Sequence, residues 1–137
     1  MDVLTPEQRR RNMSAIRGRD TKPEMIVRRL IHGMGYRYRL HVRNLPGCPD
    51  IVFTSRRKVI FVHGCFWHRH NCRLGDPVPQ TRAAFWKAKL DENKRRDEKH
   101  RRQLRRMGWN VLIIWECQIS PKKMDRLTAL LARFLEG

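Results

Sequence analysis

The sequence is poor in acidic residues and has no long apolar run. Its 137 residues include 13 Asp and Glu against 31 Lys and Arg, a formal net charge of +18. A solubilising surface needs a far smaller imbalance, so the shortage of acid favours a polyanionic partner, and nucleic acid is the usual one. No apolar run approaches the roughly 20 residues of a transmembrane helix, and the basic segments lack a clean apolar face, which disfavours a membrane-surface role.

The N-terminus shows no secretory signal, and this bears on the state of the cysteines. Residues 1–5 contain no apolar signal-peptide core, so we expect a cytoplasmic protein. In that compartment the four cysteines are expected to be reduced, metal-bound or inert rather than paired in disulfides. The length fits one domain that buries a real core.

Helix and strand signals follow one another in the order αα-βββ-α-β-α. Capping residues predict helix starts at Thr5, Thr21, Thr81 and Ser120. Alternating or continuous apolar runs predict strands at 36–42, 50–54, 58–62 and 109–115. The middle two strands form a hairpin across 55–57, and the last is of the kind buried on both faces. The order predicts an α/β fold, a mixed sandwich with a helix on each side of the sheet.

The stretch from Lys58 to Cys72 begins as a strand and breaks at Gly64 into a loop rich in His, Cys and aromatic residues. Zinc in closed tetrahedral sites prefers thiolates and neutral imidazoles. Such a ligand set is available in Cys65, His70, Cys72 and Cys117. It would tie the loop to the end of strand 109–115. Buried free thiols are the simpler interpretation, His68 could replace His70, and Cys48 is a spare ligand.

A second group, Asp50 with His63 and His68, is expected at the tips of adjacent strands. One carboxylate with imidazoles can hold a hydrated divalent ion and handle protons. A hard ion such as Mg²⁺ prefers carboxylate, water and backbone carbonyl oxygen to thiolate. We therefore expect two metals, a structural Zn²⁺ and a catalytic Mg²⁺. The simpler interpretations are a turn or strand-capping role for Asp50 and a capping box with Thr21 for Glu24.

Large aromatic residues accompany the basic loop. Trp86 has helical spacing to Leu90, which is compatible with a core position. Phe66 and Trp67 are consecutive, so they cannot both face one core. Aromatic side chains among Arg and Lys are typical of proteins that stack on unpaired bases or wedge into a base step.

At these residues the sequence resembles the very-short-patch-repair (Vsr-type) mismatch endonucleases, and the resemblance covers nearly the whole chain in order. The acidic-x-Lys step of many restriction-type nucleases is replaced by Val62-His63-Gly64, which fits the Vsr variant. The motifs that carry the resemblance are Arg11-Asn12-Met13-x-Ala15-Ile16, Leu45-Pro46-Gly47-x-Pro49-Asp50, His63-Gly64-Cys65-Phe66-Trp67-His68-x-His70-x-Cys72, Thr81-Arg82-x-x-Phe85-Trp86, Asn93-x-x-Arg96-Asp97 and Trp115-Glu116-Cys117.

The resemblance implies a restriction-endonuclease-like mixed central sheet flanked by helices. It implies residues 1–18 as an N-terminal basic helical arm that clasps DNA, and residues 19–137 as a single nuclease domain with a structural zinc site. The implied substrate is double-stranded DNA with a T:G mismatch, which arises when 5-methylcytosine deaminates, nicked 5′ of the mispaired thymine. We expect a monomer in the bacterial cytoplasm, associated with the nucleoid through DNA, and a mismatch-repair protein is a candidate partner.

The resemblance also implies individual roles. Asp50 and the backbone carbonyl of Val62 would bind Mg²⁺, and His68 would activate the attacking water or relay its protons. His63 and Glu24 would orient water and phosphate. The implied zinc ligands are Cys65, His70, Cys72 and Cys117, and the implied DNA wedge is Phe66, Trp67 and Trp86.

Two other functions remain open from the sequence. One is a restriction-like nuclease of another specificity on the same framework. The other is a non-catalytic, zinc-stabilised DNA-binding module, which has no use for Asp50 grouped with His63 and His68.

Overall fold

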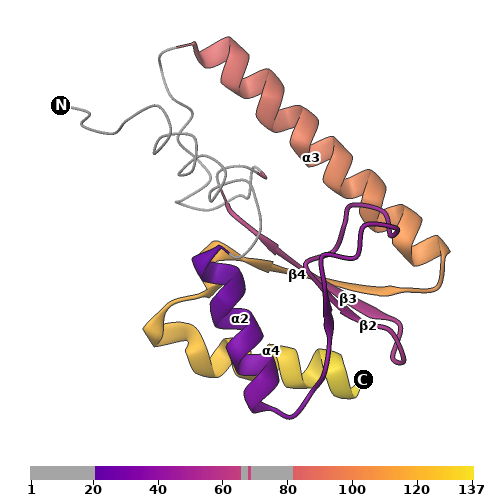
Figure 1. The fold of residues 1–137 in the computed structure, drawn as a ribbon. Coiled ribbons are helices and arrows are strands. Elements are labelled where there is room, and N and C mark those ends of the chain that lie inside the picture. The colour runs from indigo at the N-terminus through magenta and orange to yellow at the C-terminus, as the bar shows by residue number, and fades with distance from the viewer. Residues whose placement is uncertain (1–20, 66–67, 69–81) are drawn as a thin grey trace, which may run out of the picture.

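The computed structural model describes residues 21–65, 68 and 82–137 of the chain. The helices are α2 (Lys22–Gly33), α3 (Ala83–Arg106) and α4 (Met124–Glu136), and the strands are β1 (Arg39–Leu40), β2 (Ile51–Phe53), β3 (Lys58–His63) and β4 (Asn110–Trp115) (Figure 1). Two 3₁₀ turns, Glu116–Gln118 and Pro121–Lys123, precede α4. The predicted N-terminal arm, residues 1–18, lies outside the described residues.

The described strands form one mixed sheet in the order β1-β2-β3-β4. β2 is antiparallel to both β1 and β3, whereas β3 and β4 are parallel, with α3 in the connection between them. The predicted hairpin is confirmed, with Ile51 opposite Ile60 and Phe53 opposite Lys58. The predicted mixed α/β fold with a sheet flanked by helices is confirmed as well.

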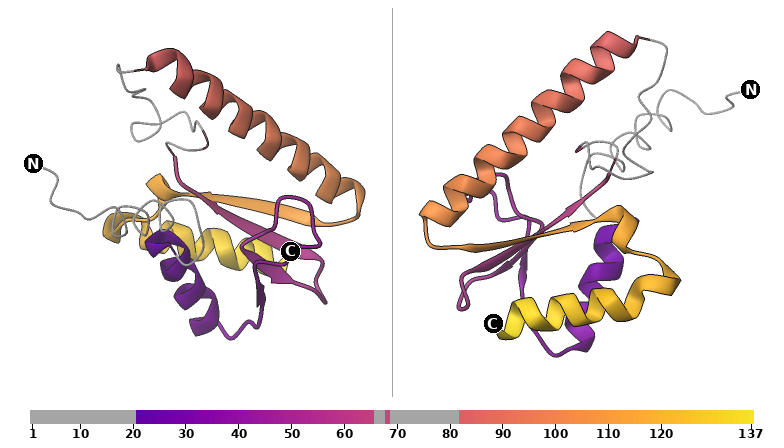
Figure 2. Two further views of the ribbon diagram at one scale, coloured as in Figure 1. Left: turned by 45° about the horizontal axis from the view of Figure 1, so that its top comes forward. Right: turned by 180° about the vertical axis from the view of Figure 1, so that it is seen from behind.

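Helices cover both faces of the sheet (Figures 1 and 2). Successive strand residues point to opposite faces, so Ile51 and Phe53 pack with α2 and α4, whereas Val52 packs on the side of α3. The first face buries Val27, Ile31, Leu127, Leu131 and Leu135 from the two helices. On the second face Leu104 of α3 packs in the core, and Leu90 is the other buried residue of this helix, which agrees with the narrow apolar track expected for it.

Two strands differ from the predictions. β1 has two residues instead of seven, because His41 adopts a left-handed backbone (φ 49°) that ends the ladder. β4 was expected to be buried on both faces, and this is wrong: Ile114 is its one fully buried residue. Among the described strands β4 pairs with β3 alone, so it forms an edge of the sheet.

Glycines at left-handed positions end two helices. Gly35 (φ 88°) follows α2 and Gly108 (φ 89°) follows α3. The next N–H after each glycine donates back into the helix, Tyr36 to the Ile31 carbonyl and Trp109 to the Leu104 carbonyl, as in a Schellman cap. α4 begins after a 3₁₀ turn rather than at Ser120, and Thr81, the predicted cap of α3, lies outside the described residues. None of the described helices is long and apolar enough to span a membrane.

Two basic residues where the turn after β2 leads into β3, Arg57 and Lys58, bind the C-terminal ends of two helices. Lys58, only 5% exposed, donates from Nζ to the carbonyls of Phe134 (2.6 Å), Leu135 (3.1 Å) and Gly137 (2.7 Å). Arg57 donates to the carbonyl of Met107 at 2.6 Å. Positive charge at helix C-termini is stabilising because it meets the negative end of the helix dipole.

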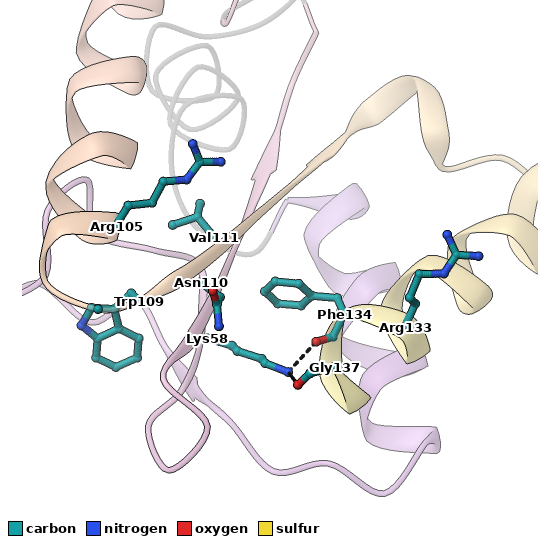
Figure 3. A pocket seen from close by; sticks show the side chains of 9 residues that line it. Lys58, Arg105, Trp109, Asn110, Val111, Arg133, Phe134 and Gly137 are labelled. Carbon is teal, nitrogen blue, oxygen red and sulfur yellow. Dashed lines mark hydrogen bonds between the residues drawn. The ribbon is translucent and has the colours of Figure 1, made fainter.

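Lys58 also borders a pocket of about 570 Å³ between the start of β4 and the end of α4 (Figure 3). The aromatic rings of Trp109 and Phe134 line it together with Arg105. The ammonium group of Lys58 is committed to helix carbonyls, and His63, at the far end of β3, is absent from the lining. The pocket is therefore remote from the histidines and carboxylates singled out in the sequence.

The loop between β1 and β2 packs tightly on α3. Gly47 has a φ of +77°, and a Cβ there would lie 3.0 Å from both Cβ and Nδ1 of His100. Figures 1 and 2 show the loop beside this helix. The contact fixes the segment that leads into Asp50 against the helix that carries Asp97.

This packing predicts an unequal effect of two glycine substitutions. Gly35→Ala meets nothing within 4 Å, so it should lower the free energy of unfolding by only the left-handed strain, about 1–2 kcal/mol. Gly47→Ala should lower it by a further amount, about 1–3 kcal/mol, because its Cβ overpacks His100. Urea unfolding followed by circular dichroism measures both.

His100→Ala supplies the control. It should recover the additional loss in Gly47→Ala and leave the loss in Gly35→Ala unchanged. Equal losses for the two glycine variants, with no rescue, would show that the loop is not packed against α3.

Candidate functional site

Ionisable side chains gather where β2 begins and where β3 and β4 end. They come from several parts of the chain. The group contains Glu24 and Arg28 of α2, His41 after β1, Asp50 before β2, His63 at the end of β3, His68, and Asp97 of α3. Two subsets bring their ligand-type atoms within 4.8 Å of one another: Glu24 with His41 and Asp50, and His63 with His68 and Asp97.

Asp50 is anchored to the neighbouring strand. The backbone N–H of Val62 donates to its Oδ2 at 2.7 Å, across the β2–β3 hairpin. Burial raises the pKa of Asp50 above its ordinary value, although the Val62 hydrogen bond and the electrostatic effects of His41, His68 and Arg28 oppose this shift. The carboxylate is thus held in place but not fully compensated, and a further cation beside it would stabilise its charged form.

Glu24 is turned toward Asp50 and is almost fully buried. Thr21 caps α2 by accepting the N–H of Glu24 at 3.4 Å, so the threonine half of the predicted capping box is confirmed. The carboxylate of Glu24, however, forms an ion pair with Arg28 and lies 3.1 Å from Nε2 of His41. Nδ1 of His41 lies 3.8 Å from Oδ1 of Asp50, so this imidazole stands between the two carboxylates.

His63 and His68 stack face to face, with ring centroids 3.7 Å apart and planes 3° from parallel. His68 directs Nδ1 at the carboxylate of Asp97. Burial lowers the pKa of His63 to about 3, and the charge of His68 acts in the same direction against that of Asp97. His63 is therefore neutral near pH 7, and among the described residues its buried Nδ1 has no hydrogen-bond partner.

The two clusters suit different chemistry. An imidazole binds a metal with the lone pair in its own ring plane, so two parallel rings 3.7 Å apart cannot chelate one ion. The His63, His68 and Asp97 cluster is suited instead to positioning and transferring a proton, with Asp97 as the group that orients His68. The Glu24, His41 and Asp50 cluster has no such obstacle and offers two carboxylates to a cation.

Two of the four predicted zinc ligands come together in the structure. Cys65 is completely buried, and the N–H of Cys117 donates to its Sγ at 3.4 Å. The N–H of Cys65 donates to Glu116 at 3.4 Å. These hydrogen bonds connect the segment after β3 to the turn after β4. The other two predicted ligands, His70 and Cys72, lie outside the described residues.

The start of α3 presents aromatic and basic side chains. Trp86 is partly buried and packs edge to face with Phe85, whose ring is 44% exposed and lies 4.2 Å from the guanidinium of Arg82. Ten of the 24 residues of α3 are Lys or Arg against four Asp or Glu. Phe66 and Trp67, the other predicted wedge residues, lie outside the described residues.

The structure brings Glu24, Asp50, His63 and His68 into one region, as expected for a single site. Three residues had no predicted role: Arg28, His41 and Asp97. Asp97 belongs to the Asn93-x-x-Arg96-Asp97 motif, which could have drawn attention to it. His41 and Arg28 occur in basic, amphipathic segments and carry no comparable signal.

Comparisons with known proteins show the relatives of this chain. A family model described as DNA mismatch endonuclease Vsr matches residues 1–74. A type II nicking enzyme of Xanthomonas oryzae, V.XorIIP, is 50% identical over 135 residues, which covers 98% of this chain and 97% of the relative. The DNA mismatch endonuclease Vsr of Escherichia coli is 42% identical over 98% of this chain and 86% of its own length. V.NmeAIP, a type II nicking enzyme of Neisseria meningitidis, is 37% identical over 91% and 89% of the two chains.

A basic mixed α/β protein whose carboxylates and histidines meet at one end of the strands of its sheet, with relatives of these names, is a DNA endonuclease. Within that class the chain belongs to the family of the DNA mismatch endonuclease Vsr.

The contact between His68 and Asp97 predicts that Asp97→Asn slows DNA nicking by about 100-fold, because an amide no longer stabilises the protonated imidazole. DNA binding should be unchanged. Single-turnover nicking and a gel-shift titration measure the two properties.

Asp125→Asn, the same change at an exposed position of α4, is the matched control and should nick at the unsubstituted rate. A full rate for Asp97→Asn would mean that Asp97 does not serve the reaction.

Proposed function

We propose that the protein nicks double-stranded DNA at a T:G mismatch, in a manner that depends on the flanking sequence, 5′ of the mispaired thymine in the repair of deaminated 5-methylcytosine. The observation that carries this proposal is the meeting of a two-carboxylate cluster and an oriented histidine at one end of the strands, where β2 begins and β3 ends. A binding module has no use for that combination.

The specificity for T:G rests on similarity. The relative from Escherichia coli is named a mismatch endonuclease, and three sequence motifs match the Vsr pattern around Asp50, His63 and Cys117. Trp86 with the exposed Phe85 offers flat apolar surface beside positive charge, which suits contact with a disturbed base step. Residues 1–18, outside the described part of the chain, would close over the DNA.

We assign the Mg²⁺ site to Asp50 and the backbone carbonyl of Val62, with the carboxylate of Glu24 beside it. The residues fit a cation because burial raises the pKa of Asp50 and leaves its charge incompletely compensated. When bound, Mg²⁺ would neutralise charge on the scissile phosphate and make a bound water more acidic. Oxygen ligands are those that Mg²⁺ prefers.

The protein's own groups would handle the proton. Asp97 fixes the ring of His68, which would accept the proton of the water that attacks phosphorus as the bond to the leaving oxygen breaks. His63, neutral and stacked on His68, would hold that ring in its plane and offer a ring nitrogen to water or phosphate. Glu24 would orient water beside the metal.

We also propose a structural Zn²⁺ on Cys65, His70, Cys72 and Cys117. The approach of Cys117 to the buried sulfur of Cys65 supports it, and thiolates with one imidazole form a ligand set of closed zinc sites. The ion would fix the loop that carries His68 to the end of β4.

The alternative of a restriction-like nuclease with another specificity uses the same catalytic residues and differs only in substrate. We expect the protein with Mg²⁺ to nick a T:G duplex in a preferred context, and to leave the matched duplex intact. Cleavage of both duplexes at one rate would favour the alternative.

Asp50→Ala should abolish nicking and retain DNA binding, because it removes a carboxylate of the metal site without removing basic surface. Nick mapping on a labelled T:G duplex and a gel-shift titration test this. Asp125→Asn serves again as the control with full activity. If Asp50→Ala still nicks, the assignment of the site is wrong.

Cys65→Ser should reduce zinc content and folded yield together, since a hydroxyl is a poor zinc ligand and the position is fully buried. Metal analysis of the purified protein and thermal unfolding measure the effect. Cys48→Ser, at the alternative ligand position, should keep its zinc; normal stability of zinc-free Cys65→Ser would refute the structural site.

A further inference from the structure

His41 occupies a position that the proposed mechanism does not use. Its imidazole lies between Glu24 and Asp50 with the side chain 9% exposed. Its backbone is fixed independently of the ring, because φ is 49° and its N–H donates to the Asp50 carbonyl at 3.2 Å. The ring is thus built into the cluster of carboxylates and does not reach it from a mobile surface segment.

The spacing of the cluster matches that of metal ligands. Nε2 of His41 and Oε2 of Glu24 are 3.1 Å apart. Two ligands at about 2.1 Å from an ion and at right angles to each other are separated by about 3 Å. All three ligand-type atoms of the cluster lie within 4.8 Å of one another.

A cationic group already contacts these atoms. Nη2 of Arg28 lies 3.0 Å from Nε2 of His41 and pairs with Glu24. Arginine carries only donors, so the contact with Arg28 requires the tautomer of His41 that is protonated at Nδ1, which faces Asp50 at 3.8 Å, and that leaves the lone pair on Nε2. A neutral imidazole with this lone pair is the form that binds metals.

The ligand chemistry then decides which ion fits. Mg²⁺ binds oxygen and retains water, whereas imidazole favours first-row transition metals. We propose that His41 is a direct nitrogen ligand of the metal centre, together with Glu24 and Asp50, and that the centre therefore binds transition-metal ions such as Mn²⁺ more tightly than Mg²⁺. The ion would replace Arg28 at Nε2 of His41.

This inference rests on the proposed function, because it places the ion at the same two carboxylates. It adds His41 as a ligand and predicts that Mn²⁺ binds more tightly than Mg²⁺. Neither statement follows from nicking activity. The two proposals can therefore be tested separately by measuring metal binding without DNA.

The experiment uses the full chain with its zinc retained and Mn²⁺ as the probe. Free Mn²⁺ is measured by electron paramagnetic resonance during titration, and Mg²⁺ affinity by competition. We expect His41→Gln to weaken Mn²⁺ binding by about tenfold or more and Mg²⁺ binding by less than about threefold, since the amide oxygen remains acceptable to Mg²⁺. His32→Gln, the same change at an exposed residue of α2, should alter neither affinity.

Pulsed resonance on the unsubstituted protein gives a test that does not depend on the folding of a variant. Bound Mn²⁺ should show coupling to an imidazole ¹⁴N, and that coupling should disappear in His41→Gln. No nitrogen coupling, or an equal loss of Mn²⁺ and Mg²⁺ affinity in His41→Gln, would overturn the inference. Unchanged metal binding in Asp50→Ala would instead refute the metal centre of the proposed function.

Discussion

The pairing of two carboxylates, the buried Glu24 and the partly buried Asp50, is the constraint on which the rest of the site depends. A charge removed from water without partners is costly, and each of these carboxylates has partners. Arg28 pairs with Glu24, the Val62 N–H binds Asp50, and His41 lies between them. These contacts require α2, the end of β1, the start of β2 and β3 to meet in one register, so the electrostatics of the site and the packing of the fold are satisfied together.

Helix α3 links the site to the rest of the molecule. Asp97 and His100 are three residues apart and so lie near one another on the helix surface. Asp97 contacts His68, and His100 packs against Gly47 in the segment that leads to Asp50. One rigid helix thus positions both the histidine and the carboxylate strand, while its remaining surface is strongly basic. One helix therefore combines a basic surface with residues that contact His68 of one cluster and the segment leading to Asp50 of the other.

Much of the fold and part of the site could be predicted from local sequence. The hairpin of β2 and β3 followed from two β-branched runs around a short polar turn, and the helix ends followed from glycines that tolerate positive φ. Asp50, His63 and His68 were grouped because strand tips are adjacent in a hairpin. The length of β1 was wrong because nothing local indicates that His41 leaves the extended region.

Periodicity, composition and side-chain chemistry along the chain were enough to predict the type of fold, the basic character of the surface and the residue types that gather at the site. How those residues divide between the two clusters depends on the tertiary structure. It placed His41 and Arg28 with the carboxylates, paired Asp97 with His68, and stacked His63 so that it cannot share an ion with His68. These pairings join residues far apart in the chain, and their geometry is set by packing across the sheet.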